Sequence, residues 1–306
     1  MRKKVVITGA SGSVISRILP DLHKAYDLVL LDLYNTDRSG RPIEGVRPVD
    51  LLNPNRDDYR AYFKGADVIV HTAYTFSPRL DSPGEDSWLR AGNAAGPRFG
   101  RALDDIRMAY NVYSMAIEEG VRRVVVFSSN QAANYYEQLI KKGLLESVDE
   151  DMVPYSDNYY GWSKISEEAL GHLFVTGYEY PGRRFELIVV RIGAPRSDLI
   201  EKCTDDDYYQ IRRCFGSYLS ADDEVQLVKR CIDTEDIRDK NGVPFLLIYG
   251  VSDNYNRIWS LRNARHVLGY EPADCSYHDY PERIKQLFGA YLDKKTAQKK
   301  GKNGKK

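Results

Sequence analysis

Short runs of apolar, mostly β-branched residues alternate with helical segments along the chain, and this alternation constrains the fold more than any other feature. Strands that are apolar throughout belong to a parallel sheet that helices cover on both faces. We therefore predict an α/β fold with a doubly wound parallel sheet. Helices are expected up to about residue 25 and over about 103–119 and 160–174. The predicted strands are Val5–Ile7, Leu28–Asp32, Asp67–His71, Val124–Ser128, Leu187–Arg191 and Phe245–Tyr249.

A glycine-rich turn follows the first predicted strand and precedes a predicted helix. Glycines at such a turn let the backbone approach a pyrophosphate, and the helix directs its N-terminal amides and dipole at the negative charge. The third small position of the pattern is Ile15, which bears on helix packing rather than on the pyrophosphate. A plain strand–helix turn is the alternative. We predict a Rossmann-type domain whose dinucleotide contacts are Gly9, Ser11, Gly12, Ser13 and Val14.

Two acidic residues follow the next β segments. Asp32 ends the second strand, about twenty residues past the glycines. A carboxylate there binds the adenosine ribose hydroxyls and repels a 2′-phosphate, which favours NAD over NADP, although the nearby Arg38 and Arg41 could soften that preference. Asp50 and Leu51 are expected to meet the adenine amino group and ring. A capping role for Asp50 is the alternative.

A tyrosine and a lysine lie four residues apart in the sequence Tyr160-Gly-Trp-Ser-Lys164, one turn apart on a helix face. An ammonium beside a phenol stabilises the phenolate and lowers a pKa that is normally about 10. The tyrosine can then exchange a proton with a substrate hydroxyl. A preceding strand ends in hydroxyls, and Ser129 can hydrogen-bond the reacting oxygen. Chance is the alternative, since the chain has 23 tyrosines. The predicted catalytic residues are Ser129, Tyr160 and Lys164.

Composition excludes several other classes of protein. The net charge is zero, but residues 294–306 carry seven lysines and no acid, so the rest of the chain is acidic and suits nucleic acid poorly. The spacing of the four cysteines and five histidines predicts no metal site. No apolar run is long enough for a membrane span, and the N-terminus does not have the pattern of a signal peptide. We expect a cytoplasmic protein with reduced cysteines.

The pattern also divides the chain. Residues 1–185 are expected to form the NAD-binding domain with the catalytic helix, and 186–293 to combine the last strands with a small substrate lobe. Residues 294–306 are expected to be a disordered, lysine-rich tail. Two polar segments, 77–99 and 136–155, are interpreted as insertions.

Taken together, the glycine turn, Asp32, residues 65–73, the helix over 111–121, and the segments over 124–130 and 159–164 resemble the extended short-chain dehydrogenase/reductase superfamily, also called NAD-dependent epimerase/dehydratase. The resemblance covers roughly residues 4–290. It implies a Rossmann fold, NAD as cofactor and a homodimer or higher homo-oligomer. It also implies further cofactor contacts from Thr72, Ala73, Tyr74, Asn111, Tyr160, Lys164 and Ile192.

A narrower resemblance is to uronate dehydrogenases. It rests on Phe-Ser-Ser-Asn130 followed by a Tyr-Tyr pair, on residues 187–193, and on Arg213 before Ser220-Ala-Asp-Asp223. It implies that Arg213 grips a sugar carboxylate, although the adjoining Arg212 and Arg213 could equally serve a phosphate or lie on a solvated helix face. An expected serine is replaced in the stretch 74–77, and Ala194 replaces a small hydroxyl residue. The implied substrate contacts are Thr75, Ser77, Asn130, Gln131, Ala194 and Arg213.

These observations lead to one hypothesis and its rivals. The hypothesis is NAD-dependent oxidation of the anomeric carbon of a hexuronate or related sugar to a lactone, with Tyr160 as general base and Lys164 tuning it. A phosphorylated or neutral sugar is the nearest alternative. A nucleotide-sugar epimerase or dehydratase would need a longer C-terminal lobe. A non-catalytic NAD-sensing protein would not need Ser129, Tyr160 and Lys164.

Overall fold

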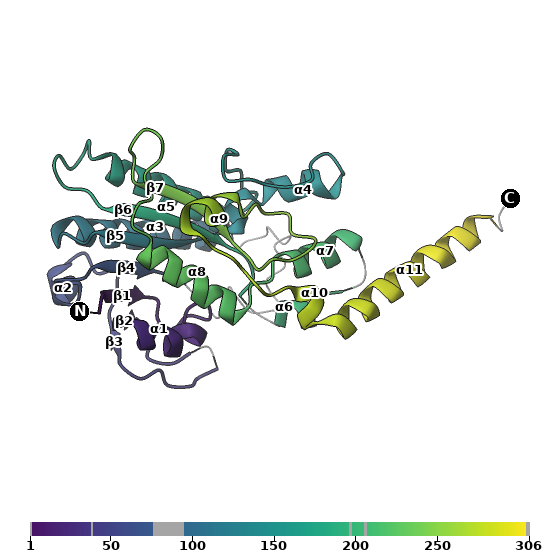
Figure 1. Cartoon of the computed structure of the whole chain (residues 1–306), viewed down its shortest axis with the longest axis horizontal. Coiled ribbons are helices and arrows are strands. Elements are labelled where there is room, and N and C mark those ends of the chain that lie inside the picture. Colours follow the sequence, from purple (N-terminus) through teal and green to yellow (C-terminus); the bar gives the residue numbers. More distant parts are fainter. Residues whose placement is uncertain (1, 38, 76–94, 196–197, 205–206, 304–306) are drawn as a thin grey trace.

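The structure is a computed structural model that describes residues 2–37, 39–75, 95–195, 198–204 and 207–303. The described residues form a parallel sheet of seven strands in the order β3-β2-β1-β4-β5-β6-β7 (Figure 1). This order confirms the doubly wound, Rossmann-type fold, in which the strand order reverses between β1 and β4. The strands are β1 (Lys4–Thr8), β2 (Asp27–Asp32), β3 (Val46–Pro48), β4 (Val68–His71), β5 (Arg123–Ser129), β6 (Glu186–Ile192) and β7 (Phe245–Gly250).

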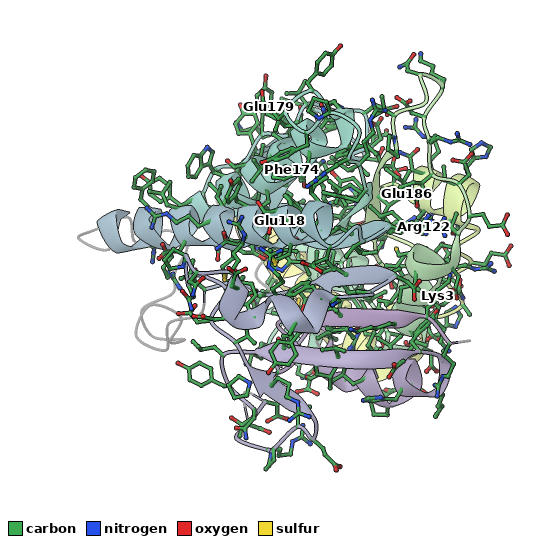
Figure 2. All side chains as sticks on the ribbon, turned by 90° about the vertical axis from the view of Figure 1, so that its left-hand side faces the viewer. Lys3, Glu118, Arg122, Phe174, Glu179 and Glu186 are labelled. Carbon is green, nitrogen blue, oxygen red and sulfur yellow. The ribbon has the colours of Figure 1, made fainter. Side chains whose placement is uncertain are left out.

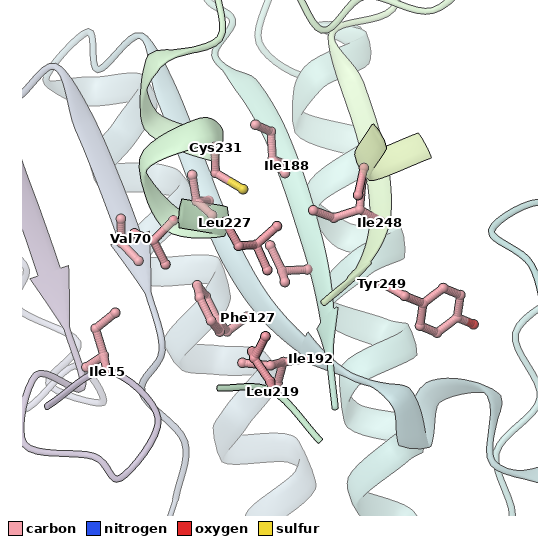
Figure 3. Packing of buried hydrophobic residues seen from close by; sticks show 14 of the residues in the cluster. Ile15, Val70, Phe127, Ile188, Ile192, Leu219, Leu227, Cys231, Ile248 and Tyr249 are labelled. Carbon is pink, nitrogen blue, oxygen red and sulfur yellow. The ribbon is translucent and has the colours of Figure 1, made fainter. Parts of the chain in front are cut away.

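Alternate residues of these strands pack into two separate cores, as apolar strands with helices on both faces require. One core joins the sheet to α1 (Leu19–Ala25) and α8 (Ala221–Asp233). Figure 3 shows Leu227 and Cys231 of α8 beside Ile188 and Phe127 of the sheet. The other core joins the opposite face to α2 (Asp57–Phe63), α3 (Ala95–Glu118) and α5 (Tyr159–Thr176).

Helices α3 and α5 lie side by side on that second face. The ring of Phe174 in α5 packs on the ring of Tyr113 in α3, with centroids 5.5 Å apart. Figure 2 labels Phe174 and Glu118, the last residue of α3. Because α5 carries Tyr160 and Lys164, this contact helps to fix the predicted catalytic residues against the sheet.

A small lobe covers the carboxyl ends of the later strands. Its own core contains Ile200, Ile211, Phe215 and Leu287. The remaining elements, several of which build this lobe, are η1 (Ser16–Ile18), η2 (Asn130–Ala133), α4 (Tyr135–Lys141), α6 (Asp198–Glu201), α7 (Tyr208–Gly216), α9 (Arg262–Leu268), α10 (Ser276–Asp279) and α11 (Pro281–Asn303).

The helix after the glycine turn begins later than expected. A 3₁₀ turn, η1, separates the glycines from α1, which starts at Leu19. Pro20 explains the delay, because proline fits the first turn of an α-helix but not its interior. Ile15, at the third small position, is fully buried in the sheet core (Figure 3). It therefore packs the turn against the sheet, where a glycine would allow a closer approach.

Two expectations about chain segments need correction. Helix α11 continues to Asn303, so residues 294–303 of the expected disordered tail are helical in this structure. Lysine, alanine and glutamine favour helices, which gives the physical reason. The segment 136–155 packs into the body, because Ile140 and Val148 are buried in the sheet core. Of the other proposed insertion, residues 77–94 lie outside the described residues and 95–99 belong to α3.

Two features are absent from the described ranges. Within them, no helix is long and apolar enough to cross a membrane. No group of three or more His, Cys, Asp or Glu side chains there is arranged to hold a metal ion.

Candidate active site

The N-terminus of α5 is built so that Tyr160 lies against the end of β5. Asn158 caps the helix, with its side-chain oxygen accepting a hydrogen bond of 2.8 Å from the Gly161 amide. A Cβ at Gly161 would come within 2.2 Å of the Gln131 carbonyl oxygen. Only glycine therefore allows the first turn of α5 to pack this closely on η2, which directly follows Ser129.

Ser129, Tyr160 and Lys164 come together as predicted. The Tyr160 hydroxyl and the Ser129 side chain are hydrogen-bonded. The Lys164 Nζ lies 5.9 Å from the centroid of the Tyr160 ring. Ser129 and Lys164 are both buried. A phenol, a hydroxyl and an ammonium thus converge at the carboxyl end of β5, where they can bind and deprotonate an alcohol.

The pKa of Tyr160 differs from the expectation. Burial raises this pKa above its ordinary value, while Lys164 and the hydrogen bond from Ser129 lower it; the result is a raised pKa. The expected lowering was wrong for this structure because desolvation of the phenolate outweighs the ammonium.

Two buried acids, Glu167 and Asp105, interact with Lys164, and neither was predicted. The Lys164 Nζ donates to both carboxylate oxygens of Glu167, at 3.0 and 3.2 Å. Burial works to lower the pKa of Lys164, but Glu167, Tyr160 and Asp105 together raise it. Burial raises the pKa of Asp105, which Lys164 partly offsets. Lys164 is therefore held as an ammonium. The i, i+3 spacing from Lys164 to Glu167 was the available signal in the sequence.

Asp105 also binds Thr75. The Thr75 amide and hydroxyl both donate to Asp105 Oδ1, at 2.7 and 2.9 Å. The structure thus places Thr75, a predicted substrate contact, in a hydrogen-bonded pair that fixes the end of the β4 loop beside Lys164. Ser77, the other candidate in this stretch, lies outside the described residues.

The predicted dinucleotide contacts gather at the point where the strand order reverses. Gly9 has a positive φ of 76°, and a Cβ there would lie 2.4 Å from the Ala73 nitrogen, so the turn after β1 packs directly on the turn after β4. Thr72 reinforces this contact through its hydroxyl, which donates to the Thr8 carbonyl at 2.9 Å. Asp32 accepts a 2.9 Å hydrogen bond from the Ser11 amide. Ser13 and Val14 complete the turn, and Tyr74 packs edge-on against Tyr160.

The residues expected to contact the adenine make hydrogen bonds within the protein. The carboxylate of Asp50 accepts a 2.9 Å hydrogen bond from the Leu52 amide, which agrees with the alternative that it caps a turn. Leu51 is buried, and its carbonyl accepts a 2.7 Å hydrogen bond from the Asn111 side chain. Arg41 is exposed and paired with Asp37 at 2.9 Å; Arg38 lies outside the described residues.

The predicted substrate contacts fall into two groups. Asn130, Gln131 and Ala194 lie at the carboxyl ends of β5 and β6, and Ile192 pairs with Ser129 across these strands. Arg213, in α7, lies in the lobe above them. Its Nε donates to Glu137 Oε2 of α4 at 2.5 Å. Glu137 was not predicted, because nothing in the sequence relates two residues that are 76 positions apart.

His71 has a structural role at the end of β4. It is buried at the end of β4, and its Nδ1 is 2.7 Å from the Thr8 hydroxyl. Burial, and then Lys164, lower the pKa of His71 to about 3. The folded protein therefore keeps this imidazole neutral at pH values where an unfolded chain protonates it.

We expect this histidine to make stability depend on pH. Because the folded-state pKa lies below the unfolded value of about 6.5, stability should fall as the pH drops through that value, by about 2 kcal/mol at pH 5. Denaturant unfolding of the wild type and of His71→Asn at several pH values measures this, with the exposed His266→Asn as control. A stability difference between wild type and His71→Asn that stays constant from pH 7 to pH 5 would contradict the assignment.

Known proteins with similar sequences include several sugar dehydrogenases. The chain is 28% identical over 280 residues to a uronate dehydrogenase of Pseudomonas putida, covering 89% of this chain and 85% of the relative. It is 27% identical over 285 residues to an NAD-dependent glucose-6-phosphate dehydrogenase of Haloferax volcanii, covering 90% and 95%. An L-arabinose 1-dehydrogenase (NAD(P)(+)) of Haloferax volcanii is 26% identical over 282 residues, covering 89% and 97%.

A solved structure of a uronate dehydrogenase has a similar fold. A mutated uronate dehydrogenase superposes with a TM-score of 0.67 at 25% identity, covering 94% of this chain and 86% of that chain. No family model matches the sequence. The fold and these relatives together show that the chain has the fold of the extended short-chain dehydrogenase/reductase superfamily and that uronate dehydrogenases are among its homologues.

Proposed function

We propose that this protein is an NAD-dependent dehydrogenase that oxidises the anomeric carbon of a free sugar, either a hexuronate or a neutral sugar, to a lactone. The observation that carries the proposal is the hydrogen-bonded pair of Ser129 and Tyr160 beside the buried Lys164. These groups lie at the carboxyl edge of the sheet, where ligands of doubly wound folds bind. The sugar dehydrogenases among the relatives support the same reaction.

The residues at the strand-order reversal fit a dinucleotide. The backbone from Gly9 to Val14 would hold the pyrophosphate, and Asp32 would accept hydrogen bonds from the adenosine ribose. The carboxylate of Asp32 is only partly buried and lies 2.9 Å from the Ser11 amide, so ribose and phosphate contacts would adjoin. NAD supplies a hydride acceptor when bound.

Three side chains of the site would bind the sugar hydroxyl and move its proton. Ser129 would hold the oxygen of the sugar hydroxyl, and Tyr160 would take its proton. Lys164 would remain an ammonium, because Glu167 and Asp105 keep its pKa raised. Its charge would stabilise the phenolate that Tyr160 forms on losing its own proton.

Isotopic labelling tests the proposed carbon. A sugar that carries deuterium at its anomeric carbon should transfer the label to the reduced cofactor and should react more slowly than the unlabelled sugar. Mass spectrometry of the cofactor and initial rates of NADH formation measure the two effects. Reduced cofactor without the label would place the oxidation at another carbon.

Asp32 should set the choice of cofactor. We expect Asp32→Ala to lower the ratio of kcat/KM for NAD over NADP by at least about tenfold, because the carboxylate no longer repels a 2′-phosphate. Initial rates with each cofactor measure the ratio, and Asp37→Ala, which changes a partly buried acid in the same loop region, serves as control. An unchanged ratio in the Asp32 variant would contradict the role.

A further inference from the structure

The side chain expected to bind a substrate carboxylate is already bound to a carboxylate of the protein. Arg213 in α7 donates through Nε to Glu137 Oε2 in α4 at 2.5 Å. The Tyr209 hydroxyl donates to the same oxygen at 2.8 Å. Glu137 is buried, with 8% of its side chain exposed, and Arg213 is partly buried. Opening such a pair for another anion would leave a buried charge unpaired, which is strongly unfavourable.

The neighbouring arginine does not replace it. Arg212 donates through Nε to the Asn256 carbonyl at 3.3 Å and through Nη2 to the Glu146 carbonyl at 3.1 Å. These bonds attach α7 to two loops of the body. Both guanidinium groups of α7 therefore already make contacts within the protein, with which a phosphate or carboxylate would compete.

The pair of Glu137 and Arg213 connects segments that lead away from the strands of the candidate site. Glu137 lies shortly after η2, which begins at Asn130 next to Ser129. Arg213 lies one turn before Ser217, whose carbonyl accepts a 2.6 Å hydrogen bond from the Ala194 amide. Figure 1 shows α4 and α7 at the same end of the sheet. The pair thus joins the segments that continue from β5 and β6 at the predicted sugar site.

The second carboxylate oxygen of Glu137 makes no hydrogen bond in the described part of the protein. Glu137 Oε1 is buried and has no hydrogen-bond partner among the described residues. An ionised carboxylate only accepts hydrogen bonds, so this oxygen fits a hydroxyl and repels an anion. A buried acceptor without a partner is costly, which makes a donating ligand group the natural complement.

We infer that the substrate is a neutral sugar, whose hydroxyl donates to Glu137 Oε1, and that Glu137 excludes hexuronates and sugar phosphates. The inference rests on the proposed sugar dehydrogenase function and selects its substrate class. Arg213 then acts as a positioning residue that holds the Glu137 carboxylate in place.

Galactose and galacturonate form a matched pair for the test, because they differ only at the carbon that carries the carboxylate. NADH formation with purified wild-type protein should give a kcat/KM for galactose, or for L-arabinose, at least about tenfold above that for galacturonate, the size of one charge-assisted hydrogen bond. Glu137→Gln should lower the ratio of kcat/KM for galactose over galacturonate by about tenfold or more.

A second buried acid provides the control. Glu150 is also buried and, among the described residues, also has a carboxylate oxygen without a hydrogen bond, but its other oxygen accepts from the Asn263 amide. Glu150→Gln should leave the galactose-to-galacturonate ratio unchanged. Circular dichroism of both variants establishes that they are folded.

The outcomes separate the inference from the proposed function. A wild-type preference for galacturonate, or a ratio that Glu137→Gln does not change, would overturn the neutral-sugar inference and leave the dehydrogenase standing. If no sugar of either kind reduces NAD, the proposed function itself fails. If Glu137→Gln does not fold, the wild-type comparison of the two sugars still decides.

Discussion

Tyr160→Phe is expected to lower kcat for sugar oxidation by about 10²- to 10⁴-fold, which is the usual contribution of a positioned general base. The substitution removes one hydroxyl and keeps the ring that packs against Tyr74. NAD binding, measured by titration calorimetry, should change little, so the loss should appear in kcat. Initial rates of NADH formation at saturating NAD measure it.

The adjacent tyrosine is a matched control for this substitution. Tyr159 is exposed, and its ring packs on Phe99 rather than toward Ser129. Tyr159→Phe should keep most of the wild-type turnover. If Tyr160→Phe kept a similar fraction, Tyr160 would not be the general base.

Arg191→Met is expected to destabilise the folded protein by about 3–5 kcal/mol, because it leaves the buried carboxylate of Glu168 without its partner. The two side chains form a bidentate pair, with Nε–Oε1 and Nη2–Oε2 distances of 2.9 and 2.7 Å, and both are almost fully buried. Glu168 also accepts a 2.5 Å hydrogen bond from Ser128. The pair therefore fastens α5 to β5 and β6. Methionine keeps the length of the side chain, so the effect reports the charge.

Denaturant unfolding measures this cost, with an exposed pair for comparison. Arg238 and Asp236 are bonded at 2.7 Å but are 63% and 56% exposed. Arg238→Ala should cost less than about 1 kcal/mol. Equal effects of the two substitutions would show that the pair of Arg191 and Glu168 does not fasten α5 to the sheet.

The strands of the sheet could be predicted from the sequence, because a strand that is buried on both faces is apolar at nearly every position. Val124–Phe127 and Leu187–Val190 are apolar at every position, and both are central strands. The start of α1 was missed because Pro20 moves it past a 3₁₀ turn. The helical residues 294–303 were missed because a run of lysines suggests a solvated tail, whereas lysine also favours a helix.

The candidate site was predictable where it depends on local spacing. Tyr160 and Lys164 are one turn apart on one helix, and Ser129 is the last residue of a strand. Glu137 and Asp105 were not predictable, because each acts on a residue that is distant in the sequence: Arg213 for Glu137, and Thr75 for Asp105. Such pairings are set by tertiary packing. The direction of the Tyr160 pKa was missed for the same reason, since burial of the hydroxyl is not visible in the sequence.

Net production of NADH over many turnovers tests the central claim most directly. Purified protein with excess NAD and a neutral aldose such as galactose or L-arabinose should accumulate NADH to many times the protein concentration, together with the lactone or its hydrolysis product. A protein that retains its NAD, converts the sugar to an isomer and releases no net NADH would instead be an epimerase, and the proposed dehydrogenase function would be wrong.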